Sequence, residues 1–378
     1  MAAPTIENDE QLYWLALQLT PGLGARKASQ LLQHFQSPPA VFRASLSELE
    51  GLGIASATAQ SLLSGCTFDD AATQQQKMLG LNVTMIPMLD ARYPQKLRAI
   101  FDPPPILFCR GRIELLDSVM IGVVGTRKPT AYGMAAADRV SRDLAEKGVT
   151  IASGMARGID TAGHKAALSV GGNTVAVLGC GVDQVYPAEN RKLAAEIAEK
   201  GLLLSEFPMG TPAYPQNFPI RNRVVSGLSA GILVVEGAQY SGSAITARLA
   251  IEQGRELFAI PGNITSKMSW APNLLIKQGA KLVQDAEDVL TDLPASDRRR
   301  LHQVAPSGPR QATLSPETES ASGRAVLGVL SPSDPAHIDT LMENLPQYSS
   351  SEVIAALFEL EMSGLVRQLP GKHFVKVW

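Results

Sequence analysis

Seven short runs of consecutive apolar residues mark the middle of the chain, at 119–125, 149–154, 173–179, 202–207, 231–237, 256–262 and 280–283. Strands with one wet face alternate apolar and polar positions, whereas continuously apolar runs are buried on both faces. The segments between the runs, such as 132–148 and 245–254, have helical spacing and end in glycine. The pattern therefore predicts an α/β domain over residues 67–290, with an extended Rossmann-like, doubly wound parallel sheet.

Residues 1–66 have a different pattern, which predicts a small SAM-like or helix-hairpin-helix domain. PGLGARKASQLL (21–32) and EGLGIASATAQSLL (50–63) each place Gly-Leu-Gly before a helix. Free amides at such a helix start can hold a phosphate, but glycines that only permit a turn give the same pattern. Only the first copy carries basic residues, Arg26 and Lys27. A phosphate contact in this domain therefore stays open.

The last part of the chain divides into a linker and a small domain. Residues 291–324 hold few large apolar side chains and many Ser, Pro and charged residues, which predicts a disordered linker. Residues 325–378 predict two helices and a hairpin turning at Pro370-Gly371, the outline of a winged helix. This domain has three basic and six acidic residues, a net charge of −3. Its second helix would be repelled by phosphates, so we predict a protein-interaction or regulatory module.

Composition limits where nucleic acid can bind. The 378 residues carry 34 Lys and Arg against 36 Asp and Glu, a net charge of −2, so any DNA site must be a local basic patch. Cys66, Cys109 and Cys180 lie far apart, so neither a disulfide framework nor a metal site is predicted, and no cofactor is expected. The acidic N-terminus and the lack of any run of ~20 apolar residues predict a cytoplasmic protein without membrane contact.

Glycine and basic residues gather in two loops that follow the first two strands. Ligands of doubly wound sheets bind at the carboxyl ends of the strands, where these loops lie. Glycine turns expose amides, and neighbouring cations suit an anion. VVGTRKPTAYG (123–133) contributes the candidates Gly125, Thr126, Arg127 and Lys128. SGMARGIDTAGH (153–164) contributes Gly154, Arg157 and Gly158, with Asp160 expected to cap a helix or pair with an arginine.

Two later loops complete the predicted site. NFPIRNRVVSGLSAG (217–231) contributes Phe218, Arg221, Asn222 and Arg223. An aromatic face for a base and arginines for phosphates are the two parts of a single-strand site. The alternative is that Phe218 belongs to the core and the arginines pair with carboxylates such as Glu206. SGSAITARLA (241–250) contributes Ser241, Gly242 and Ser243, which form either a phosphate nest or an ordinary helix cap.

Catalytic motifs are missing from the sequence. It holds no GxGxxG after the first strand, no GxxxxGK[ST], no HExxH and no GxSxG elbow between a strand and a helix. No nucleophile–base pair or carboxylate pair stands in the glycine loops. We therefore predict that the protein is not an enzyme and name no catalytic residue. The competing hypothesis is a nucleotide-processing enzyme of the lysine-decarboxylase-like or phosphoribohydrolase type, but Glu252 lies far along its helix from the loop it would serve.

The four loops, in this order, resemble those of the DprA (Smf) family of DNA-processing proteins. The similar segments include AVLGCGVDQVYPAEN (176–190) and GRELFAIPGNI (254–264), and the similarity is dense over residues 80–285. The resemblance implies a protein of natural transformation that binds and protects incoming single-stranded DNA and helps load the RecA recombinase. It also implies that Arg127, Phe218, Arg221 and Arg223 lie in the DNA pocket.

The same resemblance implies a homodimer. Family members pair through the end of the Rossmann-like domain, which corresponds to NLLIKQGAKL (273–282). Asn273, Ile276 and Leu282 are therefore expected to face a partner. The chain departs from the family at Trp270-Ala271-Pro272, where a small pair is usual. Thr126 replaces a usual serine and keeps the hydroxyl.

Overall fold

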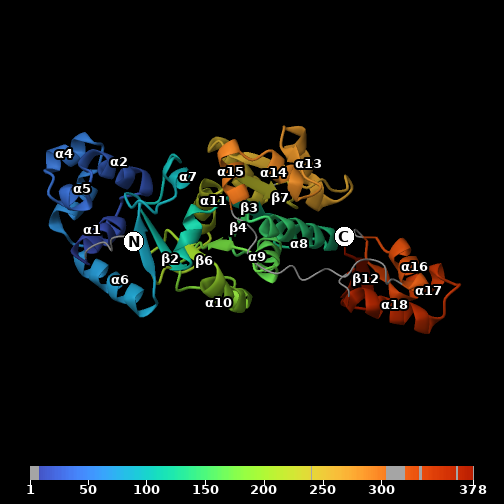
Figure 1. The fold of residues 1–378 in the computed structure, drawn as a ribbon. Helices are drawn as coiled ribbons and strands as arrows, with labels where there is room; N and C mark the ends of the chain where they lie inside the picture. The colour runs from blue at the N-terminus through green and yellow to red at the C-terminus, as the bar shows by residue number, and fades with distance from the viewer. Residues whose placement is uncertain (1–7, 240, 304–319, 332–333, 363–364, 378) are drawn as a thin grey trace.

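The computed structural model describes residues 8–239, 241–303, 320–331, 334–362 and 365–377 (Figure 1). A sheet with the strand order β1-β2-β6-β5-β4-β3-β7-β8-β9 forms its centre. The seven predicted runs are the parallel strands β3 (Met120–Val124), β4 (Thr150–Ser153), β5 (Thr174–Val177), β6 (Leu202–Ser205), β7 (Gly231–Val234), β8 (Glu256–Ala259) and β9 (Lys281–Leu282). The strands from β3 to β7 are buried throughout, as continuous apolar runs predict.

Two further strands make the sheet mixed rather than purely parallel. β1 (Thr84–Pro87) pairs antiparallel with β2 (Ile106–Gly111), which pairs antiparallel with β6. The sequence pattern did not reveal them, because prolines at 87 and 103–105 break the strand signal. Proline is compatible with the edge position of β1, where one side of the strand has no neighbour to bond.

Helices cover both faces of the sheet, which confirms the doubly wound fold. α8 (Ala131–Glu146), α9 (Ile159–Ser169) and α10 (Arg191–Lys200) lie on one face, and α11 (Asn217–Leu228), α12 (Gly242–Glu252) and α13 (Trp270–Lys277) on the other. Successive residues of β3 show the alternation: Ile121 packs in one cluster with Leu144 of α8, and Met120 packs in the other with Val225 of α11. Because the strands from β3 to β9 run parallel, the loops that follow them meet at one edge of the sheet.

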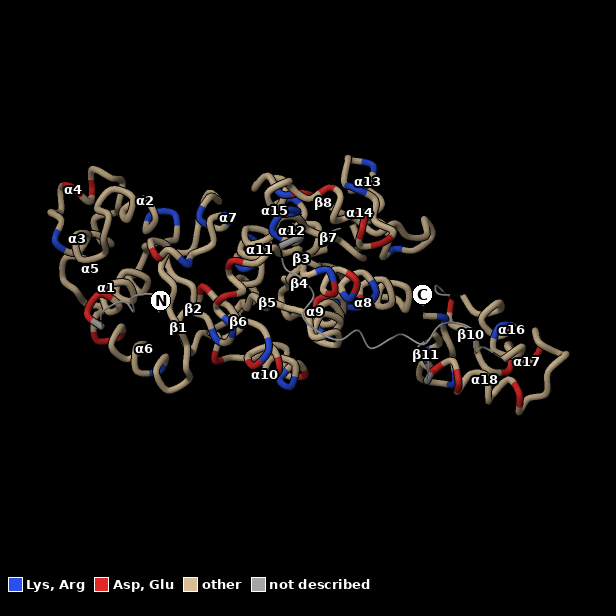
Figure 2. The backbone as a smooth tube through the Cα atoms, in the orientation of Figure 1, with Lys and Arg blue, Asp and Glu red and all other residues tan. Residues whose placement is uncertain are grey.

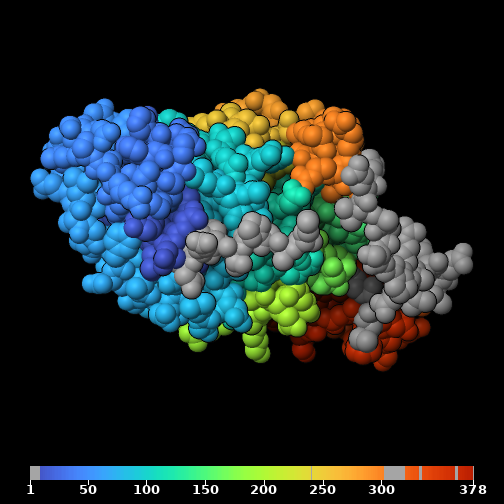
Figure 3. Space-filling view, turned by 60° about the vertical axis from the view of Figure 1, so that its left-hand side comes forward, coloured from blue at the N-terminus to red at the C-terminus, as the bar shows by residue number. Residues whose placement is uncertain are grey.

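The N-terminal helices share a core with the sheet. They are α1 (Asn8–Leu19), α2 (Ala25–Phe35), α3 (Pro38–Phe42), α4 (Leu46–Gly51), α5 (Ser56–Ser64) and α6 (Phe68–Gly80). α6 follows the predicted boundary at residue 66 and packs against α1. One cluster of buried residues runs from Trp14 of α1 through Met78 of α6 to Phe108 of β2. Figure 3 shows these helices seated directly against the neighbouring part of the chain.

The start of the predicted linker is ordered, so the prediction of disorder is wrong for residues 291–303. α14 (Ala286–Thr291) and α15 (Ala295–Gln303) pack on the body of the protein. Leu293, between the two helices, and Asp297, in α15, are both buried. The Lys96 ammonium lies 2.9 Å from both carboxylate oxygens of Asp297. The polar composition of residues 291–303 gave no sign in the sequence of the few contacts that anchor this segment. Residues 304–319, the rest of the predicted linker apart from 320–324, lie outside the described residues.

The C-terminal elements form a winged helix with its own core, as predicted. They are α16 (Ala321–Val329), β10 (Ala336–His337), α17 (Ile338–Asn344), α18 (Ser350–Met362), β11 (Val366–Leu369) and β12 (His373–Lys376). α16 starts inside the predicted linker. The wing turns at Gly371, whose φ of 82° favours glycine. Within the described parts of the chain, no helix is both long and apolar enough to span a membrane.

Candidate nucleic-acid interface

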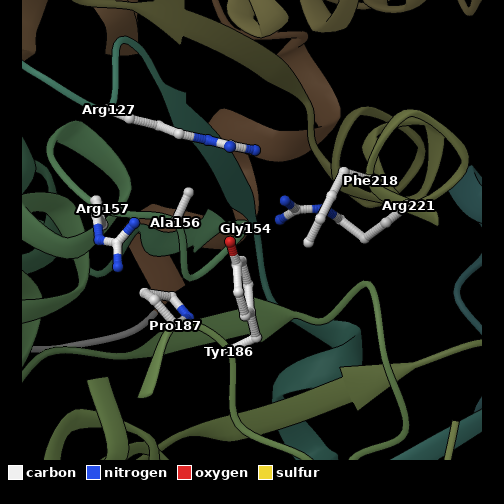
Figure 4. A pocket seen from close by; sticks show the side chains of 8 residues that line it. All are labelled: Arg127, Gly154, Ala156, Arg157, Tyr186, Pro187, Phe218 and Arg221. Atoms are coloured by element: carbon white, nitrogen blue, oxygen red, sulfur yellow. The ribbon is translucent and has the colours of Figure 1, made fainter. Parts of the chain in front are cut away.

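A hollow of about 290 Å³, a volume that includes the solvent-open space at its mouth, lies where β4 and β5 end and α11 begins. Figure 4 shows Arg127 and Arg157 reaching into it from one side, with Phe218 and Arg221 opposite them. Its lining consists of three arginines, two aromatic rings and small residues: Arg127, Gly154, Ala156, Arg157, Tyr186, Pro187, Phe218 and Arg221. Five of these residues, from three separate loops, were among the site residues predicted from the sequence.

Arg221 forms the floor of the hollow. Only 5% of the residue is exposed, and its Nη1 donates to the carbonyl oxygen of Val177 at 3.0 Å. Gly154 makes room for it, because a Cβ atom at residue 154 would overlap the guanidinium. Behind it, buried Asp160 accepts hydrogen bonds from the amides of Gly154 (3.1 Å) and Ala156 (3.3 Å). The second glycine loop therefore builds the seat for an arginine that belongs to α11.

The buried charges of Arg221 and Asp160 do not fully satisfy one another. Burial lowers the pKa of Arg221 and raises the pKa of Asp160, and in each case their mutual attraction opposes the effect of burial. Among the described residues, the Arg221 Nε has no hydrogen-bond partner. A buried guanidinium with spare donors favours an anion beside it, because an anion restores the solvation that burial removed.

Two aromatic rings and a cation form the wall of the hollow. The Arg127 guanidinium carbon lies 5.5 Å from the centroid of the Phe218 ring, within cation–π range. The Tyr186 and Phe218 ring centroids are 5.4 Å apart. Gly179 sets the position of Phe218, since a Cβ there would come within 2.9 Å of the ring. Ring faces beside guanidinium groups suit a base and a phosphate of the same strand.

Arg157 stands at the mouth of the hollow. Its Nη2 lies 2.7 Å from the Glu189 carboxylate, and both side chains are exposed. The ion pair raises the pKa of Arg157 and lowers the pKa of Glu189. An exposed pair of this kind contributes little to stability. Arg157 can therefore exchange this carboxylate for a phosphate at little cost.

The first glycine loop supports the hollow but does not form the predicted anion cup. The amide of Thr126 donates to the carbonyl of Glu236 at 2.8 Å, and the amide of Lys128 donates to the Thr126 hydroxyl at 3.2 Å. The buried Glu236 carboxylate accepts from the amide (2.9 Å) and hydroxyl (2.6 Å) of Thr130. Because these amides already have partners within the protein, they do not form the anion cup that was predicted at Gly125.

Close backbone packing explains the remaining glycines of these two loops. Gly158 has a φ of 74°, and a Cβ there would overlap the carbonyl oxygen of Thr126. A Cβ at Gly125 would overlap Ile159, whose amide donates to Thr126 at 3.3 Å. Gly125, Thr126 and Gly158 therefore hold the two loops together behind the hollow, and Lys128 is exposed beside it without lining it.

Arg223, which the sequence analysis placed in the DNA site, does not line the hollow. It is buried, paired with the Glu206 carboxylate, and its Nε lies 3.2 Å from an oxygen of Asp102. Burial raises the pKa of Glu206 to about 7, against the attraction of Arg223. The alternative of a pair with Glu206 therefore holds for Arg223 and not for Arg221. Asn222, between them, is half-buried and does not line the hollow.

The fourth loop does not line the hollow either. The hydroxyls of Ser241 and Ser243 lie 2.8 Å apart beside Gly237, and Gly242 is exposed at the start of α12. Conversely, the sequence prediction named neither Ala156, Tyr186 nor Pro187. The tyrosine and proline of VYPAEN follow the glycine-rich end of β5. An aromatic residue in a loop at that edge was the signal that would have found them.

The residues predicted at a dimer interface have different environments. Asn273 is tied to Gly262 by two hydrogen bonds, of 3.1 and 2.9 Å, so it braces a loop. Ile276 is half-buried and packs against the core. Leu282 is 45% exposed on β9, which is the last strand of the sheet. Leu282 is the one of the three placed to meet a partner.

The competing enzyme hypothesis finds no catalytic group in this hollow. Within the described lining there is no carboxylate side chain. Glu252 pairs with Arg248 at 2.9 Å on the exposed face of α12. His164 is fully buried with its Nδ1 2.7 Å from the Thr174 hydroxyl, and burial lowers its pKa to about 3. A neutral, enclosed imidazole can serve as neither general acid nor general base for a ligand in the hollow.

Fold and site together define a doubly wound α/β protein with an arginine-lined pocket at the carboxyl edge of its sheet and a winged helix after it. The family model "DNA recombination-mediator protein A" matches residues 84–294, and the "DprA winged helix domain" model matches residues 310–372. The chain belongs to the DNA recombination-mediator protein A family, whose members are called DprA or Smf.

Individual relatives agree with this assignment. Protein Smf of Escherichia coli K12 is 42% identical over 296 residues, 77% of each chain. DprA of Bacillus subtilis is 44% identical over 213 residues, 56% of this chain and 72% of the relative. The X-ray structure of DprA from Streptococcus pneumoniae has a TM-score of 0.68 at 33% identity and covers 78% of this chain and 99% of its own. A structure of DprA from Helicobacter pylori, described as giving insight into a single-stranded DNA binding mode, has a TM-score of 0.52 at 30% identity. It covers 57% of this chain and 98% of its own.

Proposed function

We propose that this protein binds single-stranded DNA, with little sequence preference, in the hollow at the end of β4 and β5. Arg221, Arg127 and Arg157 take phosphates, and a base stacks on Phe218. The observation that carries the proposal is the Arg221 guanidinium in the lining of the hollow, whose Nε has no partner among the described residues, beside the half-buried ring of Phe218. Stacking tolerates any base, and the description of the Helicobacter pylori relative names the same ligand.

Arg127→Ala tests the proposal through the salt dependence of binding. Each phosphate contact to a single strand adds about 0.7 to the slope of log affinity against log salt. We expect Arg127→Ala to weaken binding of an oligo-dT and to lower that slope by ~0.7. Anisotropy titrations at several salt concentrations measure both quantities. Lys128→Ala is the matched control, because Lys128 is the adjacent cation and does not line the hollow. Equal slopes for both variants would contradict a phosphate contact at Arg127.

The wider role follows from the family. We infer that the protein acts in the cytoplasm during natural transformation, protects incoming single strands and helps load the RecA recombinase onto them. The match to a recombination-mediator family supports this inference. Loading is checked with RecA filament assembly on strands covered by single-strand-binding protein, which the intact protein should accelerate and an Arg127→Ala variant should not.

We infer that two copies pair through β9. An edge strand leaves a row of unpaired backbone groups, and exposed Leu282 adds apolar surface to it. Leu282→Arg should bury a charge at the contact and give monomers in sedimentation velocity at concentrations where the wild type is dimeric. The control is Lys281→Arg, a substitution at the position next to Leu282 that keeps the positive charge of residue 281. A dimeric, folded Leu282→Arg protein would place the contact elsewhere.

We also infer that the winged helix binds protein rather than duplex DNA. Ile354 and Phe358, one turn apart on α18, are 50% and 65% exposed, and α18 carries glutamates and no basic residue. Figure 2 shows the acidic positions around this helix. Truncation after Gln303, which keeps α15, should leave oligo-dT affinity within about twofold, because phosphate contacts dominate it. Tight duplex binding that the truncation removes would refute this inference.

A further inference from the structure

A second pair of an aromatic ring and a guanidinium lies outside the hollow. Phe101 follows α7 (Gln95–Arg98) and is 75% exposed. The Arg26 guanidinium carbon, from the start of α2, lies 4.4 Å from the centroid of the Phe101 ring. A single exposed apolar residue is ordinary. This ring, however, carries a guanidinium as Phe218 does, and unlike Phe218 it is mostly exposed to solvent.

The charge beside Phe101 is free to meet an anion. In the described parts of the chain, no carboxylate oxygen lies within 4 Å of the Arg26 guanidinium. Arg98 is exposed and donates to the backbone carbonyl of Asp90 at 2.8 Å, while the Asp90 carboxylate is paired with Arg92 at 2.6 Å. Arg26 therefore holds an unneutralised positive charge on the Phe101 ring, whereas the Arg98 guanidinium carbon lies 5.6 Å from the centroid of the Tyr93 ring.

The segment that carries Phe101 is connected to the hollow through α11. Asp102, next to Phe101, lies 3.2 Å from the Nε of Arg223. Arg223 follows Phe218 by five residues in the same helix, a rise of about 7.5 Å along the axis. Between them, Pro219 and Ile220 are exposed on the surface. α11 therefore contacts the hollow at Phe218 and the segment that carries Phe101 at Arg223.

We propose that Phe101 and Arg26 form a second contact for the same single strand, with a base on the exposed ring of Phe101 and a phosphate on Arg26. The proposal rests on the proposed function of the hollow, because it needs a strand that is already bound there. Single-stranded nucleic acid is the occupant that uses both an exposed ring and an unneutralised guanidinium group. It also gives a role to the basic copy of the Gly-Leu-Gly segment, PGLGARK.

The test compares oligo-dT of two lengths on the full-length protein: about six nucleotides, for the hollow alone, and about thirty, for both contacts. In a Phe101→Trp variant, the added tryptophan fluorescence should be quenched by the long oligonucleotide and not by the short one. Phe101→Ala should weaken long-oligonucleotide binding by about 5- to 100-fold and leave short-oligonucleotide binding unchanged. Arg26→Ala should lower the salt slope by ~0.7 for the long one only.

Controls separate this proposal from that for the hollow. Leu79→Ala removes an equally exposed apolar side chain from α6 and should change neither affinity. Arg127→Ala should weaken both lengths; if it weakens neither, the proposed function itself fails. If Arg127→Ala weakens both while Phe101→Ala and Arg26→Ala bind the long oligonucleotide like wild type, only the second contact is refuted. A change in sedimentation of Phe101→Ala without a change in binding would refute it too, and would assign Phe101 to self-association.

Discussion

Gly154→Ala should abolish DNA binding although residue 154 itself offers a ligand no side chain. The added Cβ would occupy the place of the Arg221 guanidinium, which would have to shift into the hollow that it lines. Arg221 must leave, and the buried Asp160 loses its counter-charge. Breaking a buried ion pair costs about 3–5 kcal/mol, which is an upper limit here because the two charges attract one another without a contact within 4 Å. We therefore expect a loss of several kcal/mol in the free energy of unfolding together with the loss of oligo-dT binding.

A double variant distinguishes loss of the site from loss of the fold. Asp160→Asn in the Gly154→Ala background removes the unpaired charge and keeps an oxygen to accept from the amide of Ala156. Chemical denaturation should show stability largely recovered, while anisotropy shows binding still absent. Gly80→Ala, where an added Cβ meets nothing within 4 Å, is the control and should change neither property. Normal binding by the double variant would show that Arg221 is dispensable.

Phe218→Ala should weaken binding of a short oligo-dT by about 1–3 kcal/mol, the usual contribution of one stacked base. The expected loss combines the missing stack with the release of Arg127, whose position above the ring depends on Phe218. Substituting the same position with Trp, Leu and Ala provides a graded series. Stacking predicts affinities in the order Trp, Phe, Leu and Ala, with the main step between Phe and Leu.

A different order would assign Phe218 another role. If Leu binds like Phe, the side chain acts through its bulk, for example by packing on Gly179, and not through its ring. The isotherms should be measured at a fixed salt concentration, because the phosphate contacts make affinity depend on it. Thermal unfolding of each variant checks that the α11 start remains folded, which is expected because Phe218 is only half-buried.

Much of the fold was predictable because burial on both faces leaves a periodic signal in the sequence. The seven parallel strands and the winged helix follow from it, whereas β1 and β2 were hidden by prolines and α15 by its charges. The site was predictable to the level of loops. Which arginine faces the ligand was not, because Arg221 and Arg223 differ by two positions on one helix and so point to different sides of it.

That difference is settled by residues far away in the chain. Arg221 enters the hollow because Gly154, after β4, leaves space and Asp160 supplies charge. Arg223 turns to Glu206, after β6, and to Asp102. Sequence reasoning left the pairing with Glu206 open and had no means to assign it to one arginine. In the same way, the Glu236 carboxylate that caps the loop after β3 lies more than a hundred residues from its partner Thr130.

The continuous core from Trp14 to Phe108 determines which segments of this protein unfold together. Segments that share buried contacts open together, and segments with separate cores open independently. The N-terminal helices and the sheet therefore behave as one cooperative unit, and the winged helix as another. A protease or a denaturant will release the C-terminal unit intact, but it cannot remove the first eighty residues without exposing the interior on which the pocket is built.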